Sequence, residues 1–128
     1  MDASPTKILV VSRTPAALAP FGQALATEAH ARISFAPDGR AALAVVAGEH
    51  PALVVVDQKL PDLAQEELVQ EIMAVDAGID VALVSPLPPE EFHDTYEGLG
   101  LIGQLPPQPG LSQARELAAY WRQLHPQS

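Results

Sequence analysis

The feature that most constrains the fold is a regular alternation of short apolar runs with segments of helical periodicity. Apolar residues between the runs recur at the three- and four-residue spacing of helices. The runs that we expect to be strands are 7–11, 32–35, 53–56, 81–84 and 101–102. Strands that alternate with helices in this way predict a parallel sheet covered by helices on both faces. Reaction or ligand sites in such sheets lie beyond the carboxyl ends of the strands.

Turn and cap residues indicate where several helices begin. Thr14 and Pro15 suit the N-cap and the first position of one helix. Asp38 is a candidate cap for a helix that runs through Ala47, and Pro88 or Pro89 can begin another. Apolar spacing indicates the other two helices, one marked by Leu68, Ile72 and Val75 and the last by Leu111, Ala114, Leu117, Ala118, Trp121 and Leu124.

Length and composition favour a single domain. The 128 residues fit one domain over 1–128, with a core expected at about 6–125. The chain has no cysteine, which excludes disulfides and cysteine-ligated zinc. Its histidines are scattered, and no two stand at the spacing of a helical metal site. The apolar runs are too short for a signal peptide or a membrane span, so we expect a cytoplasmic protein with no membrane partner.

Charge is distributed unevenly along the chain. The net charge is −9, and no lysine or arginine occurs between Lys59 and Arg115. Ten acidic residues fall in that stretch: Asp62, Glu66, Glu67, Glu71, Asp76, Asp80, Glu90, Glu91, Asp94 and Glu97. Such a surface repels phosphate backbones, so direct nucleic-acid binding is not expected. The acidic stretch is either a solvated face that aids solubility or a docking face for a basic partner.

One segment carries a specific resemblance. In residues 50–62 an apolar strand ends at Asp57, and the turn Leu60-Pro61-Asp62 follows. This pattern resembles the phosphorylation segment of CheY-like response-regulator receiver domains. The strand 8–11, the pair 38–39 and the segment 83–85 also match, so the resemblance covers nearly the whole chain. It implies a flavodoxin-like doubly wound sheet with strand order 2-1-3-4-5 and five helices. It also implies that Asp57 is the phospho-acceptor and that Ser85 supplies a hydroxyl to the phosphoryl group.

The chain departs from the family at several positions of the same site. Ser12 and Arg13 stand where the family has an adjacent acidic pair. The lysine that follows the fifth strand in the family is replaced by Leu105 or Pro107, depending on the alignment. Two further departures are Gln65, in place of a glycine after the Pro-Asp turn, and Pro86, in place of a small residue.

These departures bear directly on phosphoryl transfer. By resemblance, magnesium would be held by the acidic pair, by Asp57 and by the carbonyl oxygen of Lys59. Mg²⁺ requires near-octahedral oxygen ligands, and Asp57 is the only carboxylate left at the predicted site. We therefore expect the Mg²⁺ site to be lost and no cofactor to be bound. Arg13 either pairs with Asp57 in place of the metal or points into solvent, and both interpretations stay open.

We expect a degenerate receiver, or pseudo-receiver, in two-component phosphorelay signal transduction. It would not be an enzyme, and it would bind a histidine kinase or another signalling protein with weak or absent phosphorylation at Asp57. One alternative is a working phospho-acceptor served by a dedicated histidine kinase. Another is an unrelated flavodoxin-like enzyme or cofactor binder, against which stands the absence of a Gly-x-Gly-x-x-Gly, P-loop or Asp-x-His-x-x-Gly motif.

Overall fold

The computed structural model describes residues 6–125, which form one five-stranded parallel sheet and five helices. The strand order β2-β1-β3-β4-β5 confirms the predicted 2-1-3-4-5 topology. The strands are β1 Thr6–Val11, β2 Ala31–Ala36, β3 Leu53–Val56, β4 Asp80–Val84 and β5 Gly103–Leu105. The helices are α1 Pro15–Ala29, α2 Gly39–Glu49, α3 Gln65–Val75, α4 Pro89–Thr95 and α5 Leu111–Leu124.

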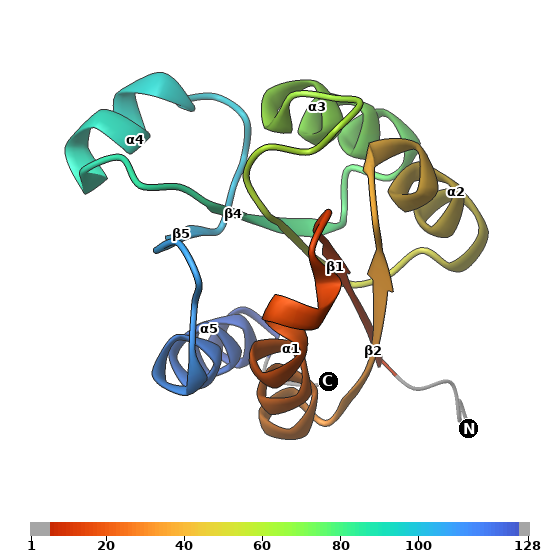
Figure 1. The fold of residues 1–128 in the computed structure, drawn as a ribbon, viewed down its shortest axis with the longest axis vertical. Coiled ribbons are helices and arrows are strands. Elements are labelled where there is room, and N and C mark those ends of the chain that lie inside the picture. The colour runs from red at the N-terminus through yellow and green to blue at the C-terminus, as the bar shows by residue number, and fades with distance from the viewer. Residues whose placement is uncertain (1–5, 126–128) are drawn as a thin grey trace.

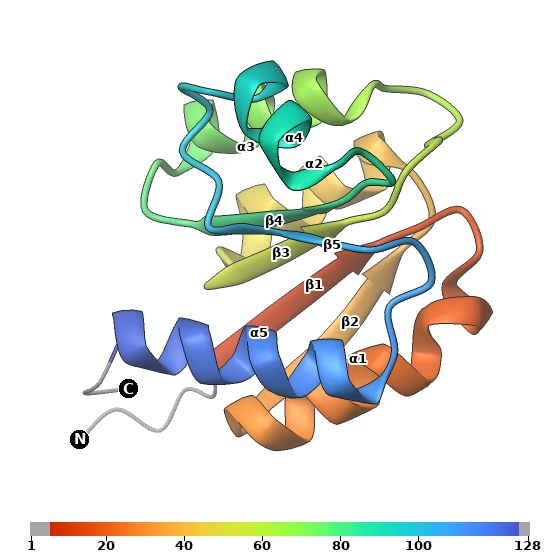
Figure 2. The same ribbon diagram turned by 90° about the vertical axis from the view of Figure 1, so that its left-hand side faces the viewer.

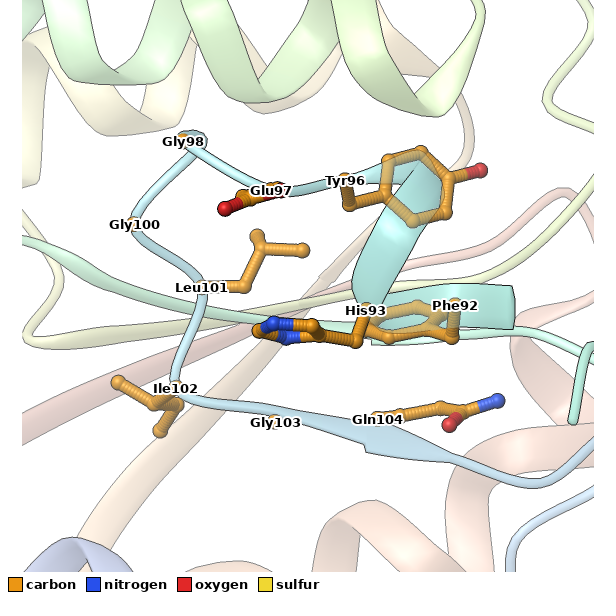
Figure 3. Close-up of a pocket in the computed structure, with 10 residues that line it drawn as sticks. All are labelled: Phe92, His93, Tyr96, Glu97, Gly98, Gly100, Leu101, Ile102, Gly103 and Gln104. Atoms are coloured by element: carbon orange, nitrogen blue, oxygen red, sulfur yellow. The ribbon is translucent and has the colours of Figure 1, made fainter. Parts of the chain in front are cut away.

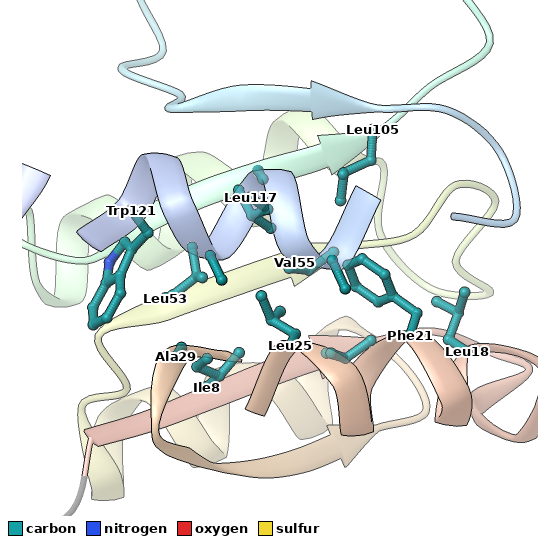
Figure 4. Close-up of a cluster of buried hydrophobic side chains, with 14 of the residues drawn as sticks. Ile8, Leu18, Phe21, Leu25, Ala29, Leu53, Val55, Leu105, Leu117 and Trp121 are labelled. Carbon is teal, nitrogen blue, oxygen red and sulfur yellow. The ribbon is translucent and has the colours of Figure 1, made fainter. Parts of the chain in front are cut away.

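Helices cover both faces of the sheet, which explains why the central strands are wholly apolar. Helices α1 and α5 lie on one face, and α2, α3 and α4 lie on the other (Figures 1 and 2). Side chains alternate along a strand, so Ile8 and Val10 pack toward α1 and α5, while Leu9 and Val11 pack toward α2 and α3. Figure 4 shows the first of these two clusters, with Phe21 and Trp121 among its large members.

Two of the predicted helix starts are confirmed, and one prediction is refined. Helix α2 has Asp38 as its N-cap, and the Asp38 side chain accepts a hydrogen bond from the Ala41 amide at 2.8 Å. Helix α1 begins at Pro15 with Thr14 in the N-cap position, although the Thr14 side chain makes no capping bond. Helix α4 begins at Pro89, the second of the two prolines considered.

The predicted position of the fifth strand is wrong by two residues. We placed it at Leu101 and Ile102, whereas β5 covers Gly103–Leu105. Ile102 donates its amide to the Val81 carbonyl at 2.9 Å, and regular pairing begins only at Gly103. Leu101 and Ile102 are apolar because they pack against the two opposite cores at the edge of the sheet, not because they belong to a paired strand.

Within residues 6–125, no helix combines the length and the apolar character needed to cross a membrane.

The strand order places the carboxyl ends of β1, β3 and β4 side by side. Each of these strands is followed at once by a residue of the predicted site, so the topology brings Ser12, Asp57 and Ser85 to one edge of the sheet.

Candidate functional site

Asp57 lies at the carboxyl end of β3, next to the end of β1. Its amide donates a 2.8 Å hydrogen bond to the Val11 carbonyl, which continues the pairing of the two strands by one residue. Ser12 follows β1 and is fully buried. Parallel pairing therefore places the side chains of Ser12 and Asp57 together, although 45 residues separate them in the sequence.

Both carboxylate oxygens of Asp57 are engaged by donors. The Ser12 hydroxyl donates to Oδ2 at 2.8 Å, and the Gln58 amide donates to Oδ1 at 2.9 Å. The Ser12 oxygen also accepts a hydrogen bond from the Thr14 amide at 3.0 Å. Because a carboxylate oxygen can only accept, the single proton of the Ser12 hydroxyl is directed toward Asp57.

A pocket of about 180 Å³ opens beside Asp57. Its lining residues are Arg13, Thr14, Ala17, Leu18, Asp57, Gln58, Lys59 and Gln108. The Arg13 side chain is exposed, and among residues 6–125 no ion pair joins it to Asp57. Of the two interpretations of Arg13, the geometry favours a guanidinium at the pocket rim in contact with solvent.

Of the other predicted positions, Lys59 lines this pocket, whereas Ser85, Leu105 and Pro107 are not among its lining residues. Ser85 follows β4 and is buried, and its hydroxyl oxygen accepts from the Leu87 amide at 3.2 Å. Leu105, the first candidate for the lysine position, is 5% exposed and packs in the core with α1 and α5. Pro107, the second candidate, is exposed in the loop before α5. Lys59 and Gln108 line the pocket with left-handed backbones, at φ 59° and 53°.

The residues around Asp57 do not fit a magnesium ion. Mg²⁺ binding relies on carboxylate oxygens, and among residues 6–125 the only carboxylate that lines this pocket is Asp57 itself. Across residues 6–125, no group of three or more acidic, histidine or cysteine side chains is arranged to hold a metal. Arg13 and Lys59 add positive charge to the same pocket, which opposes a divalent cation.

The Leu60-Pro61-Asp62 turn docks the β3–α3 loop onto helix α2. The Asp62 carboxylate accepts from the Gly39 and Arg40 amides, each at 2.9 Å. The Gly39 hydrogen bond is the main cause that lowers the pKa of Asp62, and the Arg40 amide and charge act in the same direction. Amides at a helix N-terminus favour a negative charge, so the turn is an electrostatic anchor for the loop that follows Asp57.

Two glutamines near the site have partners that sequence analysis did not foresee. The Gln65 side-chain amide donates to the carbonyls of Val56 and Val84, at 3.1 and 2.8 Å. The Gln104 side-chain amide donates to the carbonyls of Ser85 and Leu87, at 3.2 and 2.7 Å. The only signal in the sequence was the replacement of a glycine by Gln65, and nothing marked Gln104.

No protein-family model and no curated protein matches the sequence. Solved structures do match over almost the whole chain. A CheY-like response regulator receiver domain protein from Methanospirillum hungatei JF-1 has a TM-score of 0.78 at 22% identity, covering 94% of each chain. The chain has the fold of a response-regulator receiver domain.

Two further receivers show the same fold at lower sequence identity. The chemotaxis response regulator CheY4 of Vibrio cholerae has a TM-score of 0.78 at 17% identity, covering 91% of this chain and 98% of its own. The REC domain of AraT, a response regulator from Geobacillus stearothermophilus, has a TM-score of 0.81 at 14% identity, covering 98% and 100%. The receiver topology is thus retained although most of the side chains differ.

This chain has a second pocket, of about 330 Å³, between α4 and the segment that leads into β5 (Figure 3). We call it the α4–β5 pocket. Its lining residues are Phe92, His93, Tyr96, Glu97, Gly98, Gly100, Leu101, Ile102, Gly103 and Gln104. Glu97 lines this pocket, and Glu90, Glu91 and Asp94 are exposed on α4, the helix that supplies Phe92 and His93 to the lining.

Proposed function

We propose that this chain is a receiver-like module of two-component signalling that works by protein–protein contact and does not depend on phosphorylation of Asp57. The observation that carries the proposal is that both Asp57 oxygens are bonded, to the Ser12 hydroxyl and to the Gln58 amide. The receiver fold supports a role in signalling, and the altered site supports independence from phosphate.

The chemistry of phosphoryl transfer explains why the altered site supports this proposal. Phosphoryl transfer to a carboxylate needs a nucleophilic oxygen, whose reactivity a donated hydrogen bond lowers, and the charge on the phosphoryl group has to be neutralised. Here the Asp57 oxygen that faces Ser12 accepts a hydrogen bond, and Ser12 and Arg13 replace the acidic pair expected by resemblance. A loss of about 4 kcal/mol of transition-state stabilisation slows a reaction roughly a thousandfold.

The α4–β5 pocket is the surface that we propose for the partner. The apolar and aromatic lining of this pocket comes from Phe92, Tyr96 and Leu101. Glu97 also lines the pocket, and Glu90 is exposed on α4. An amphipathic segment with apolar anchors and flanking lysine or arginine side chains complements both properties. The partner would be a histidine kinase or another signalling protein that presents such a segment.

Labelling with a small phosphodonor tests the independence from phosphate. The protein is treated with acetyl phosphate and Mg²⁺, and the intact mass is measured beside Asp57→Asn and Arg13→Asp. We expect no added phosphoryl group in the unmodified protein, because no second carboxylate among residues 6–125 lines the Asp57 pocket to recruit Mg²⁺, and the Asp57 oxygens accept hydrogen bonds from Ser12 and Gln58. Rapid stoichiometric labelling that is absent in Asp57→Asn would overturn the proposal, whereas a gain of labelling in Arg13→Asp alone would show that the residue at position 13 limits the reaction.

Charge reversal tests the proposed partner surface. Proteins crosslinked in a lysate of the source organism are compared for the unmodified chain, Asp57→Asn, and the pair Glu90→Lys with Glu91→Lys on α4. The matched control is Glu66→Lys with Glu71→Lys, which makes the same charge change at exposed positions of α3. We expect one set of partners to be retained in Asp57→Asn and in the α3 control, and to be lost in the α4 variant. Loss of the partners in Asp57→Asn would contradict the proposal.

A working phospho-acceptor is the second candidate, because the open pocket beside Asp57 and the docked Leu60-Pro61-Asp62 turn are retained. A dedicated kinase would then supply the positioning that small donors lack. Labelling of Asp57 by a purified kinase, but not by acetyl phosphate, would favour this candidate.

A further inference from the structure

Two side-chain amides hold the carboxyl end of β4 and the loop that follows it. Gln65 reaches from the start of α3 and bridges the last carbonyls of β3 and β4, those of Val56 and Val84. Gln104 reaches from β5 and bridges the carbonyls of Ser85 and Leu87. Together they engage three carbonyl groups of the segment 84–87 from two sides.

These contacts use the donor capacity of a primary amide fully. A glutamine side chain carries two N–H donors, and the Gln65 and Gln104 nitrogens each meet two carbonyl oxygens. Carbonyls beyond the end of a strand have lost their sheet partners and otherwise need water. A side chain that engages two of them from neighbouring segments restricts the relative movement of those segments.

The segment 84–87 is tied by backbone contacts as well. The Ser85 amide donates to the Leu105 carbonyl at 2.9 Å, and the Ser85 hydroxyl accepts from the Leu87 amide at 3.2 Å. The loop then enters α4, and Phe92 of this helix and Tyr96 at its C-cap line the α4–β5 pocket. Gln104 lines the same pocket, so it contacts both the loop and the cavity.

We propose that Gln65 and Gln104 are positioning residues that hold the β4–α4 loop, and with it the α4–β5 pocket, in one arrangement that is independent of the state of Asp57. None of the bonds that carry the proposal passes through the Asp57 side chain, which bonds instead to Ser12 and Gln58. The identity of the pocket as the partner surface rests on the proposed function, but the restraint of the loop does not.

Amide hydrogen exchange measured residue by residue tests the proposal. Gln65→Met and Gln104→Met keep the length of the side chain and remove its N–H donors. We expect the Leu87 and Phe92 amides to exchange roughly fivefold faster in each variant, since a hydrogen bond contributes on the order of 1 kcal/mol. Gln23→Met, at an exposed position of α1, is the matched control and should leave these rates unchanged.

The β1 amides of residues 8–11 report global stability in the same experiment. Unchanged rates at Leu87 and Phe92 in both glutamine variants would overturn the proposal. An equal acceleration in β1 would overturn it too, because the glutamines would then stabilise the whole domain and not the loop.

Asp57→Asn separates this proposal from the proposed function. We expect it to leave the exchange of Leu87 and Phe92 unchanged, and an acceleration equal to that of Gln65→Met would mean that the loop is controlled from Asp57. Rapid labelling of Asp57 by acetyl phosphate would remove the proposed function, but it would leave the effect of the glutamine substitutions on exchange as the separate test.

Discussion

The Ser12 hydroxyl donates a 2.8 Å hydrogen bond to Oδ2 of Asp57, and it does so from a side chain that is fully buried. The contact joins the ends of β1 and β3, which are neighbours in the sheet. By resemblance to receivers, Ser12 and Arg13 occupy the positions of an adjacent acidic pair that would hold a metal ion. The serine at this position donates a hydrogen bond to Asp57 and supplies no carboxylate oxygen.

A double-mutant cycle measures this pair. Hydrogen bonds to a charged group contribute about 1.5–3 kcal/mol, so Ser12→Ala and Asp57→Ala should show a coupling of that size in urea unfolding. The control cycle uses Ser112→Ala, at an exposed position of α5, in place of Ser12→Ala. Its effect on the free energy of unfolding should add to that of Asp57→Ala. Additive effects for Ser12 and Asp57 would refute the energetic importance of the bond.

Magnesium binding follows from the same geometry. Because Asp57 is the only carboxylate that lines its pocket, calorimetric titration should give no isotherm at millimolar Mg²⁺. The double variant Ser12→Asp with Arg13→Asp adds two carboxylates and removes a cation, and we expect it to bind Mg²⁺ measurably. A clear isotherm in the unmodified protein that disappears in Asp57→Asn would contradict this prediction.

The Asp62 anchor predicts a pH-dependent contribution to stability. The pKa of Asp62 is lowered from 3.8, chiefly by the Gly39 amide, so the folded state favours the ionised carboxylate. The stabilisation is fully present above that ordinary value and is lost as the pH falls through the lower folded pKa. Asp62→Asn should therefore lower the urea midpoint at pH 7, and the difference from the unmodified protein should close in strong acid. A difference that is independent of pH would show that charge is not involved.

A second carboxylate, at the opposite end of the sheet, anchors α5. Asp80 Oδ2 accepts from Trp121 Nε1 at 3.1 Å and lies 2.6 Å from His125 Nε2. Trp121 is 2% exposed, so Asp80→Ala leaves a buried indole N–H without this partner and should cost about 1–3 kcal/mol. Urea unfolding followed by circular dichroism measures the change. In a Trp121→Phe background the same substitution should cost less, and an equal cost would place the effect elsewhere.

The sequence by itself determined the order of the elements, the parallel topology and the position of Asp57. Strands such as 53–56 are apolar at every residue because both faces of the sheet are buried, and this pattern is visible without coordinates. Asp38 and Pro15 mark helix starts through local backbone chemistry that acts within a few residues. Residues that end neighbouring parallel strands share one edge, so the meeting of Ser12 and Asp57 follows from the topology.

Only the tertiary structure decided the contacts between segments. The run 101–102 looked like a strand, but pairing with β4 starts at Gly103, because register depends on where the chain comes alongside its neighbour. The roles of Gln65, Gln104 and the Asp80–Trp121 pair depend on a few hydrogen bonds between residues far apart in sequence. Such bonds have no periodicity, and glutamine and aspartate are ordinary surface residues, so their roles become visible only when the distant carbonyl or indole group is in place.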